Sequence, residues 1–165
     1  MKSCDSEVSD YTRALETCKD FRDVFKLVKS SVEVTLHKRR AGLMLCLADL
    51  PPTVAAYHEV GSNTLVVNRL LLKAVKDSKS RGEFNAYLYA ILLHEYLHAV
   101  GYLDEAEVRR LVHLIAEAVM GPRHPATKIA ADPMAIIFHT PLKYYRPTGA
   151  VELIADFGLE HQYVI

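Results

Sequence analysis

The chain has 165 residues, half of them hydrophobic, and its 20 basic residues balance 20 acidic ones. This length predicts one domain with a substantial core, and a formal net charge of zero gives no reason to expect a nucleic acid or an anionic membrane as a partner. The longest apolar run, residues 86–93, is too short to span a bilayer. The N-terminus has no apolar segment of the signal-peptide kind, so we expect a soluble cytoplasmic protein.

The first half of the chain predicts one helix followed by a small sheet. Ser9 or Asp10 can cap a helix that runs to about residue 30. Apolar and polar residues then alternate, which predicts a half-buried strand, and a continuous apolar run predicts a central strand. Two further strands are expected on either side of a tight turn. The expected strands cover residues 31–37, 43–48, 53–60 and 64–67. These features favour an α+β fold with a small mixed sheet.

The second half predicts mainly helices. A short helix is expected over 68–75, and the next, over 83–100, is apolar on nearly all sides, which predicts that it is buried. Gly101 is expected to end that helix. A further helix should run from Asp104 or Glu105 to Met120. In the tail, we expect a helix around 151–157.

The buried helix ends in His94-Glu95-x-x-His98. The four-residue spacing places His94 and His98 on one helical face, so that two ring nitrogens can bind one zinc ion. Glu95 should lie beside the metal, where its carboxylate can take a proton from a metal-bound water. Two histidines and a glutamate are unfavourable in an apolar helix unless they are paired or bind a metal. The motif therefore predicts a zinc site.

The extended sequence His94-Glu95-x-x-His98-x-x-Gly101-x-x-Asp104 resembles the motif of zincin metallopeptidases. It is similar to the metzincin motif with Asp in place of the usual third His, as in the snapalysin group. The resemblance implies a small mixed sheet that carries the active-site helix, with further helices around it. It also implies a peptide or protein substrate and Asp104 as the third zinc ligand.

A helix directly after Gly101 leaves a second arrangement open. It resembles the gluzincins, including very small archaeal ones, in which a Glu on the second helix is the third ligand. Glu105, Glu107 and Glu117 are then the candidates. Asp104 is also suited to cap that second helix. The short return from Gly101 nevertheless favours Asp104 as the ligand.

The resemblance implies hydrolysis of peptide bonds, with Glu95 as the general base. It further implies that an edge strand within 53–60 pairs with an extended substrate. The developing charge on the carbonyl oxygen needs a stabilising group, for which the tail offers His139, Tyr144 and Tyr145. Two other interpretations stay open: a zinc hydrolase of the nuclease type, and a latent or non-catalytic zinc-binding regulatory module. The sequence predicts no oligomeric state.

Overall fold

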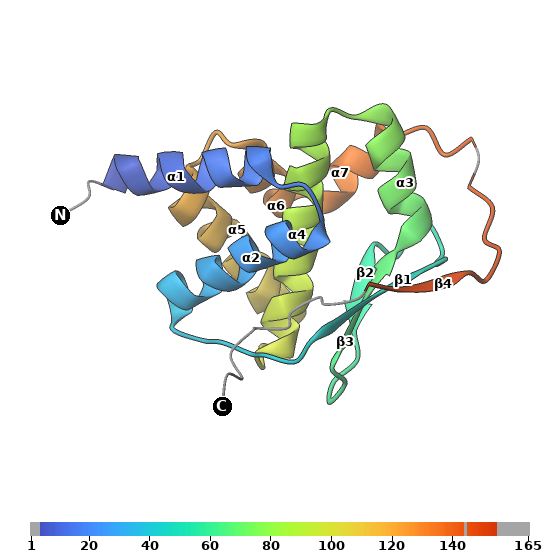
Figure 1. The fold of residues 1–165 in the computed structure, drawn as a ribbon, viewed down its shortest axis with the longest axis horizontal. Coiled ribbons are helices and arrows are strands. Elements are labelled where there is room, and N and C mark those ends of the chain that lie inside the picture. The colour runs from blue at the N-terminus through green and yellow to red at the C-terminus, as the bar shows by residue number, and fades with distance from the viewer. Residues whose placement is uncertain (1–3, 144, 155–165) are drawn as a thin grey trace.

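A buried central helix, α4, separates a group of helices from a small sheet (Figure 1). The computed structural model describes residues 4–143 and 145–154, and the side chains of residues 8–143 and 145–154. The elements of these residues are α1 (Cys4–Thr17), α2 (Phe21–Leu36), β1 (Met44–Ala48), β2 (Ala56–His58), β3 (Thr64–Asn68), α3 (Arg69–Ser78), α4 (Arg81–Ala99), α5 (Glu105–Met120), α6 (Pro125–Ala131), α7 (Pro133–Phe138) and β4 (Val151–Ile154). The expected α+β class with a small mixed sheet is confirmed.

The sheet has the strand order β2-β3-β1-β4. Strand β1 runs parallel to β3 and antiparallel to β4, and β2 runs antiparallel to β3. In the β1–β3 register, Leu45 lies beside Leu65 and Leu47 beside Val67, and all four side chains are buried. This face of the sheet therefore contributes to the core. Strand β2 has no second neighbouring strand among the described residues, so it forms one edge of the sheet, and α4 packs against it.

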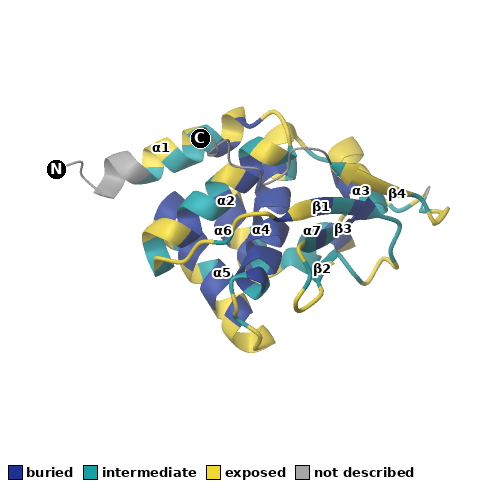
Figure 2. Ribbon diagram, turned by 60° about the horizontal axis from the view of Figure 1, so that its bottom comes forward, coloured by how far each residue is buried: buried dark blue, intermediate teal, exposed yellow. Residues whose placement is uncertain are grey.

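Helix α4 is buried along nearly its whole length, as its apolar sequence predicts (Figure 2). A capping box closes its N-terminus: the Ser80 hydroxyl accepts from the backbone N–H of Glu83, and the Glu83 carboxylate accepts from the N–H of Ser80. The buried amide of Asn85 donates to the carbonyl oxygens of Leu15, in the last turn of α1, and of Cys18, which follows that helix. These bonds anchor the helix at the end opposite the histidines.

The N-terminal third differs from the prediction. The expected single helix is two helices, because Asp20 starts a new one: its side chain accepts from the backbone N–H of Asp23. The strand expected over 31–37 is wrong, since these residues continue α2 as far as Leu36. Val28 and Val32 are buried one helical turn apart, and that spacing suits a helix packed on α4.

The other elements follow the prediction more closely. Strands β1 and β3 and helices α3, α4 and α5 are confirmed, with small shifts at their ends. The strand expected over 53–60 is shorter, because only Ala56–His58 pairs with β3. The helix expected around 151–157 is wrong for residues 151–154, which form β4. Residues 155–157 lie outside the described part of the chain.

Asn68 joins the sheet, α3 and the segment that leads into β2. Its side chain has no exposed surface. The amide oxygen accepts from the backbone N–H groups of Leu70 and Leu71 and caps α3. The amide nitrogen lies 2.9–3.2 Å from three backbone carbonyl oxygens, those of Leu50, Pro51 and Val54. One buried amide thus holds the segment 50–54, which leads into the edge strand β2.

Asn68→Asp should destabilise the fold by on the order of 2–3 kcal/mol, because a carboxylate cannot donate to these carbonyl groups. Urea unfolding at pH 7 measures the loss. Asn68→Ser is the control: it keeps an acceptor for the helix cap and places no charge among the carbonyls, so it should lose less. The loss in Asn68→Asp should shrink at pH 4, where the buried carboxyl gains a proton that it can donate. Wild-type stability of Asn68→Asp at pH 7 would contradict this role.

Candidate metal centre

His94 and His98 lie one turn apart at the C-terminal end of α4, with their Nε2 atoms 3.3 Å apart. Nδ1 of His98 lies 2.8 Å from the backbone carbonyl oxygen of Tyr102. Because a carbonyl oxygen only accepts, this bond assigns the imidazole proton to Nδ1. In the neutral ring, Nε2 of His98 then carries the lone pair that can bind a metal ion.

Gly101 makes this arrangement possible by turning the chain back at the end of α4. Its φ is +110°, a conformation that side chains disfavour. Its N–H bonds the carbonyl oxygen of His98 at 3.1 Å, and the N–H of Tyr102 bonds that of Leu97 at 3.0 Å. The turn brings the Tyr102 carbonyl to the His98 ring and lets α5 start three residues after Tyr102.

Glu105, in the first turn of α5, contacts both imidazoles. Its Oε1 lies 3.1 Å from Nε2 of His94, and its Oε2 lies 3.1 Å from Nε2 of His98. The ligand atoms of the three residues all lie within 4.8 Å of one another, so the group could hold a metal ion. Two imidazole nitrogens and one carboxylate oxygen are a donor set found at catalytic zinc sites. We call these three side chains the His/His/Glu cluster.

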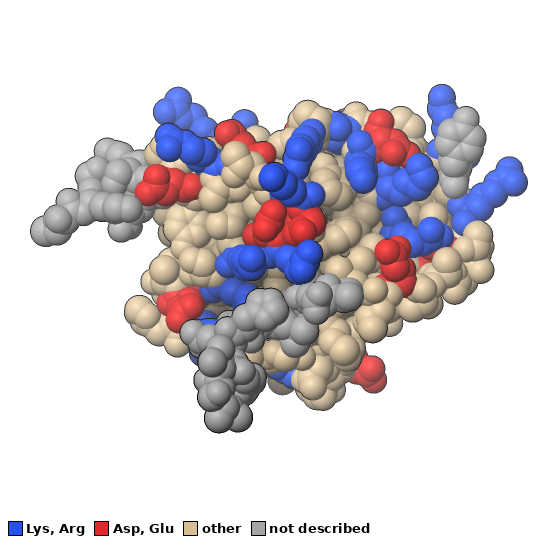
Figure 3. Space-filling view, in the orientation of Figure 1, with Lys and Arg blue, Asp and Glu red and all other residues tan. Residues whose placement is uncertain are grey.

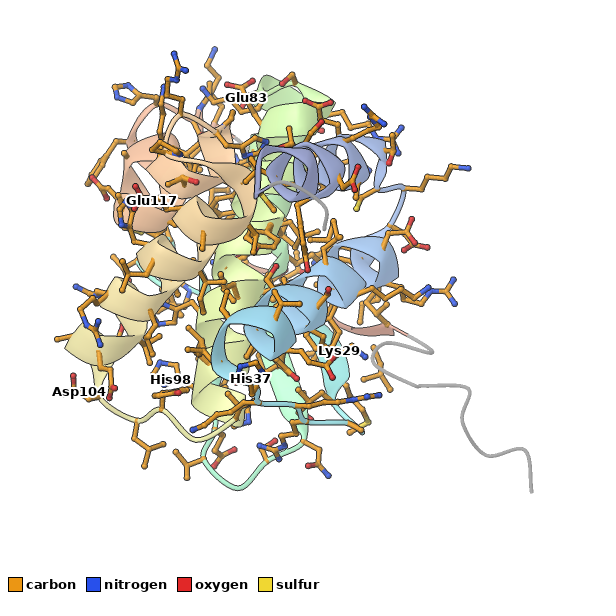
Figure 4. The ribbon with its side chains drawn as sticks, turned by 90° about the vertical axis from the view of Figure 1, so that its left-hand side faces the viewer. Lys29, His37, Glu83, His98, Asp104 and Glu117 are labelled. Atoms are coloured by element: carbon orange, nitrogen blue, oxygen red, sulfur yellow. The ribbon has the colours of Figure 1, made fainter. Side chains whose placement is uncertain are left out.

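The structure brings Glu105 to the imidazoles in the place expected for Asp104. Oδ1 of Asp104 accepts from the backbone N–H of Glu107 at 2.7 Å and caps α5. Figure 4 shows Asp104 at the start of α5 and Glu117 farther along the same helix, away from His98. The Glu117 carboxylate lies near His113, also on α5. Among the described residues, the cluster contains neither Asp104 nor the alternatives Glu107 and Glu117.

Glu95 lies beside the cluster and is almost fully buried, with 6% of its surface exposed. Burial raises the pKa of Glu95 to about 8, and the negative charge of Glu105 adds to the rise. The backbone N–H of His58, at the end of β2, donates to the Glu95 carboxylate and opposes the shift. Without a cation nearby, Glu95 is thus mostly protonated at neutral pH, and a metal ion bound by the cluster would favour its carboxylate form. The bond from β2 holds the Glu95 side chain in place.

A cavity of about 370 Å³ opens beside the cluster, next to the segment that leads into the edge strand β2. It is lined by Thr53, Val54, Ala55 and Ala56 at the sheet, Ala90, Ile91, His94 and Glu95 on α4, Glu105 and Arg109 on α5, and Ala130, Ala131, Asp132, Pro133 and Met134 around the α6–α7 junction. Two other cavities, of about 220 and 380 Å³, contain no residue of the cluster. Six of the fifteen residues that line the cavity beside the cluster are polar or charged and the other nine are apolar, and such a combination of converging polar groups with apolar walls is found at ligand-binding sites.

The protonation states of the cluster suit metal binding. Burial raises the pKa of Glu105, but the positive charge that His94 and His98 carry when protonated, together with the Arg109 guanidinium, outweighs burial and holds that pKa below its ordinary value. Burial lowers the pKa of His94, and His98 and Arg109 lower it further against the opposing charge of Glu105. These shifts favour a carboxylate and a neutral imidazole, the forms that bind a metal ion.

Among the described residues, the tail side chains expected to stabilise developing charge do not line this cavity. His139 follows α7 as its C-cap, and the hydroxyl of Tyr145 bonds the backbone beyond β1. Tyr144 lies outside the described residues. The cavity instead contains Arg109, which the sequence interpretation missed. Its four-residue spacing from Glu105 was the available signal, since such pairs share one helical face.

Comparisons with protein-family models, curated proteins and solved structures each found no match. Within residues 4–143 and 145–154, no helix is both long enough and apolar enough to cross a membrane. On the face shown in Figure 3, basic and acidic side chains are interspersed, in keeping with the zero net charge. Fold and site together define an α+β protein with a candidate His/His/Glu metal centre beside a cavity.

Proposed function

We propose that this protein is a zinc-dependent metallopeptidase in which His94, His98 and Glu105 bind the metal. The observation that carries the proposal is the position of Glu95, a buried carboxylate that lines the same cavity as the cluster and is not part of it. A metal held by two imidazoles and one carboxylate keeps an open coordination position. A desolvated base next to such a position is the arrangement needed for hydrolysis.

The chain's own residues would carry the proton transfers. When bound, zinc would polarise the scissile carbonyl and lower the pKa of a water molecule. Glu95 takes a proton from the attacking water and passes it to the leaving amine. The N–H of His58 orients the Glu95 carboxylate, and the Tyr102 carbonyl orients the His98 ring.

The substrate in this proposal is an extended peptide. Residues 53–56 line the cavity where the chain enters the edge strand β2. The carbonyl groups of Val54 and Ala55 already accept from Asn68, so the backbone of Ala56 is the part of this edge that could pair with a peptide added as a further strand. Small apolar side chains on other elements, including Ala90 of α4 and Ala130 of α6, also line the cavity. A peptide along this edge would pass His94 and Glu95, which line the same cavity.

Zinc content and hydrolysis by the full chain test the proposal. Elemental analysis should find about one zinc per chain. Casein or a peptide library should be cleaved, cleavage should stop when a chelator removes the metal, and it should return when zinc is added. An RNA-cleavage assay run alongside distinguishes a peptidase from a nuclease. A chain that holds zinc and cleaves neither substrate would contradict the proposal and favour a regulatory module.

A further inference from the structure

Arg109 shares a carboxylate oxygen with His94. Its Nε lies 3.3 Å from Oε1 of Glu105, one turn earlier on α5. The same Oε1 lies 3.1 Å from Nε2 of His94. The guanidinium group is therefore placed next to the His94 side of the cluster.

That side of the cluster faces the cavity. His94, Glu95, Glu105 and Arg109 line the cavity, whereas His98 does not. The Arg109 side chain is 74% exposed, and only its Nε has a bonding partner among the described residues. The N–H groups on Nη1 and Nη2 remain available to a molecule in the cavity.

Arg109 also carries the one fixed positive charge of this cavity, as far as the described residues go. The other charged residues that line it, Glu95, Glu105 and Asp132, are acidic. A peptide carbonyl gains negative charge when water adds to it, and correctly placed donors stabilise that charge. Glu105 holds Nε and so limits the orientations of the guanidinium group.

We propose that Arg109 is a catalytic residue that donates from its Nη groups to the scissile carbonyl oxygen as this oxygen gains negative charge. The proposal rests on the proposed peptidase function. No proton is transferred from Arg109, because a guanidinium stays protonated throughout. The competing role is a positioning one, in which Arg109 only orients Glu105 for metal binding.

Arg109→Gln distinguishes the two roles. With a catalytic role, kcat should fall on the order of 10²-fold while KM and zinc content change little. Low concentrations of guanidinium chloride should restore part of the activity of Arg109→Ala. The matched control is Arg110→Gln, which removes a neighbouring exposed arginine that does not line the cavity and should leave kcat and zinc content unchanged.

An unchanged kcat in Arg109→Gln would overturn the proposal, and so would a loss of activity that only follows a loss of zinc. If the wild type holds zinc and hydrolyses no peptide, the peptidase proposal fails, and binding of inorganic phosphate then decides the role of Arg109. Titration calorimetry should show phosphate binding to the zinc-loaded wild type and at least about tenfold weaker binding to Arg109→Gln, as expected when a charge-assisted donor is lost. Equal affinities would show that Arg109 does not bind anions in this cavity.

Discussion

Glu95→Gln should abolish peptide hydrolysis and leave zinc content and fold unchanged. The Glu95 carboxylate lies outside the group that could bind the metal, so its replacement removes no ligand. An amide has the same shape and can still accept the hydrogen bond from the backbone N–H of His58, but it cannot take a proton from water. Loss of a general base lowers kcat by roughly 10²–10⁴-fold.

Activity, zinc and stability must be measured on the same preparation of Glu95→Gln. Elemental analysis and the thermal unfolding midpoint should match the wild type. Glu107→Gln is the matched control, because Glu107 is exposed and does not line the cavity; its kcat should equal that of the wild type. Hydrolysis by Glu95→Gln at the wild-type rate would remove Glu95 from the mechanism. A loss of zinc would instead make Glu95 a ligand.

Glu105→Gln should weaken zinc binding sharply, whereas Asp104→Asn should leave it close to wild type. Both Glu105 oxygens contact an imidazole Nε2, and an amide is a poor substitute for a carboxylate ligand. Groups that only support a ligand typically account for 10- to 100-fold in metal affinity, so the loss of a ligand should exceed about 100-fold. Asp104 caps α5, and Asn caps a helix as well as Asp does.

Competition with a chelating dye measures both zinc affinities. The unfolding midpoint of the zinc-loaded protein should fall in Glu105→Gln, because metal binding stabilises the folded state. In the metal-free proteins, this difference from the wild type should largely disappear. Weak zinc binding by Asp104→Asn together with wild-type zinc affinity in Glu105→Gln would show that Asp104, and not Glu105, is the third zinc ligand.

The part of the site that could be read from the sequence lies on one helix. His94, Glu95 and His98 are separated by at most one turn of α4, so their relative placement follows from helix geometry. The apolar sequence of α4 predicts that the helix is buried, and Gly101 predicts where it ends. Both predictions depend only on residues that are close together in the sequence. The start of α5 at Glu105 is equally local.

The third candidate ligand could not be settled in that way. Asp104 and Glu105 are adjacent, both are acidic, and an acidic residue at this point suits a helix cap as well as a metal ion. The packing of α5 against α4 places Glu105 beside the imidazoles. The Asp104 carboxylate instead accepts a hydrogen bond from the backbone N–H of Glu107. Arg109 joined the site for the same reason, since only that packing places its helical face at the cavity.

Local patterns by themselves predicted the burial of α4 and the relative placement of His94, Glu95 and His98 on it, whereas contacts between distant segments decided the rest of the fold and of the candidate site. Val32 and Val34 alternate with polar residues as in a strand, whereas Val28 and Val32 are spaced as on one face of a helix. The packing of α2 on α4 selected the helix. Residues 151–154 form a strand because β1, about a hundred residues earlier, offers an edge to pair with. The cavity itself forms only where the segment leading into β2, the helices α4 and α5, and the α6–α7 junction come together. Local sequence patterns do not predict which distant segments pack together, because their apolar groups are buried and their hydrogen bonds are formed only when these segments assemble.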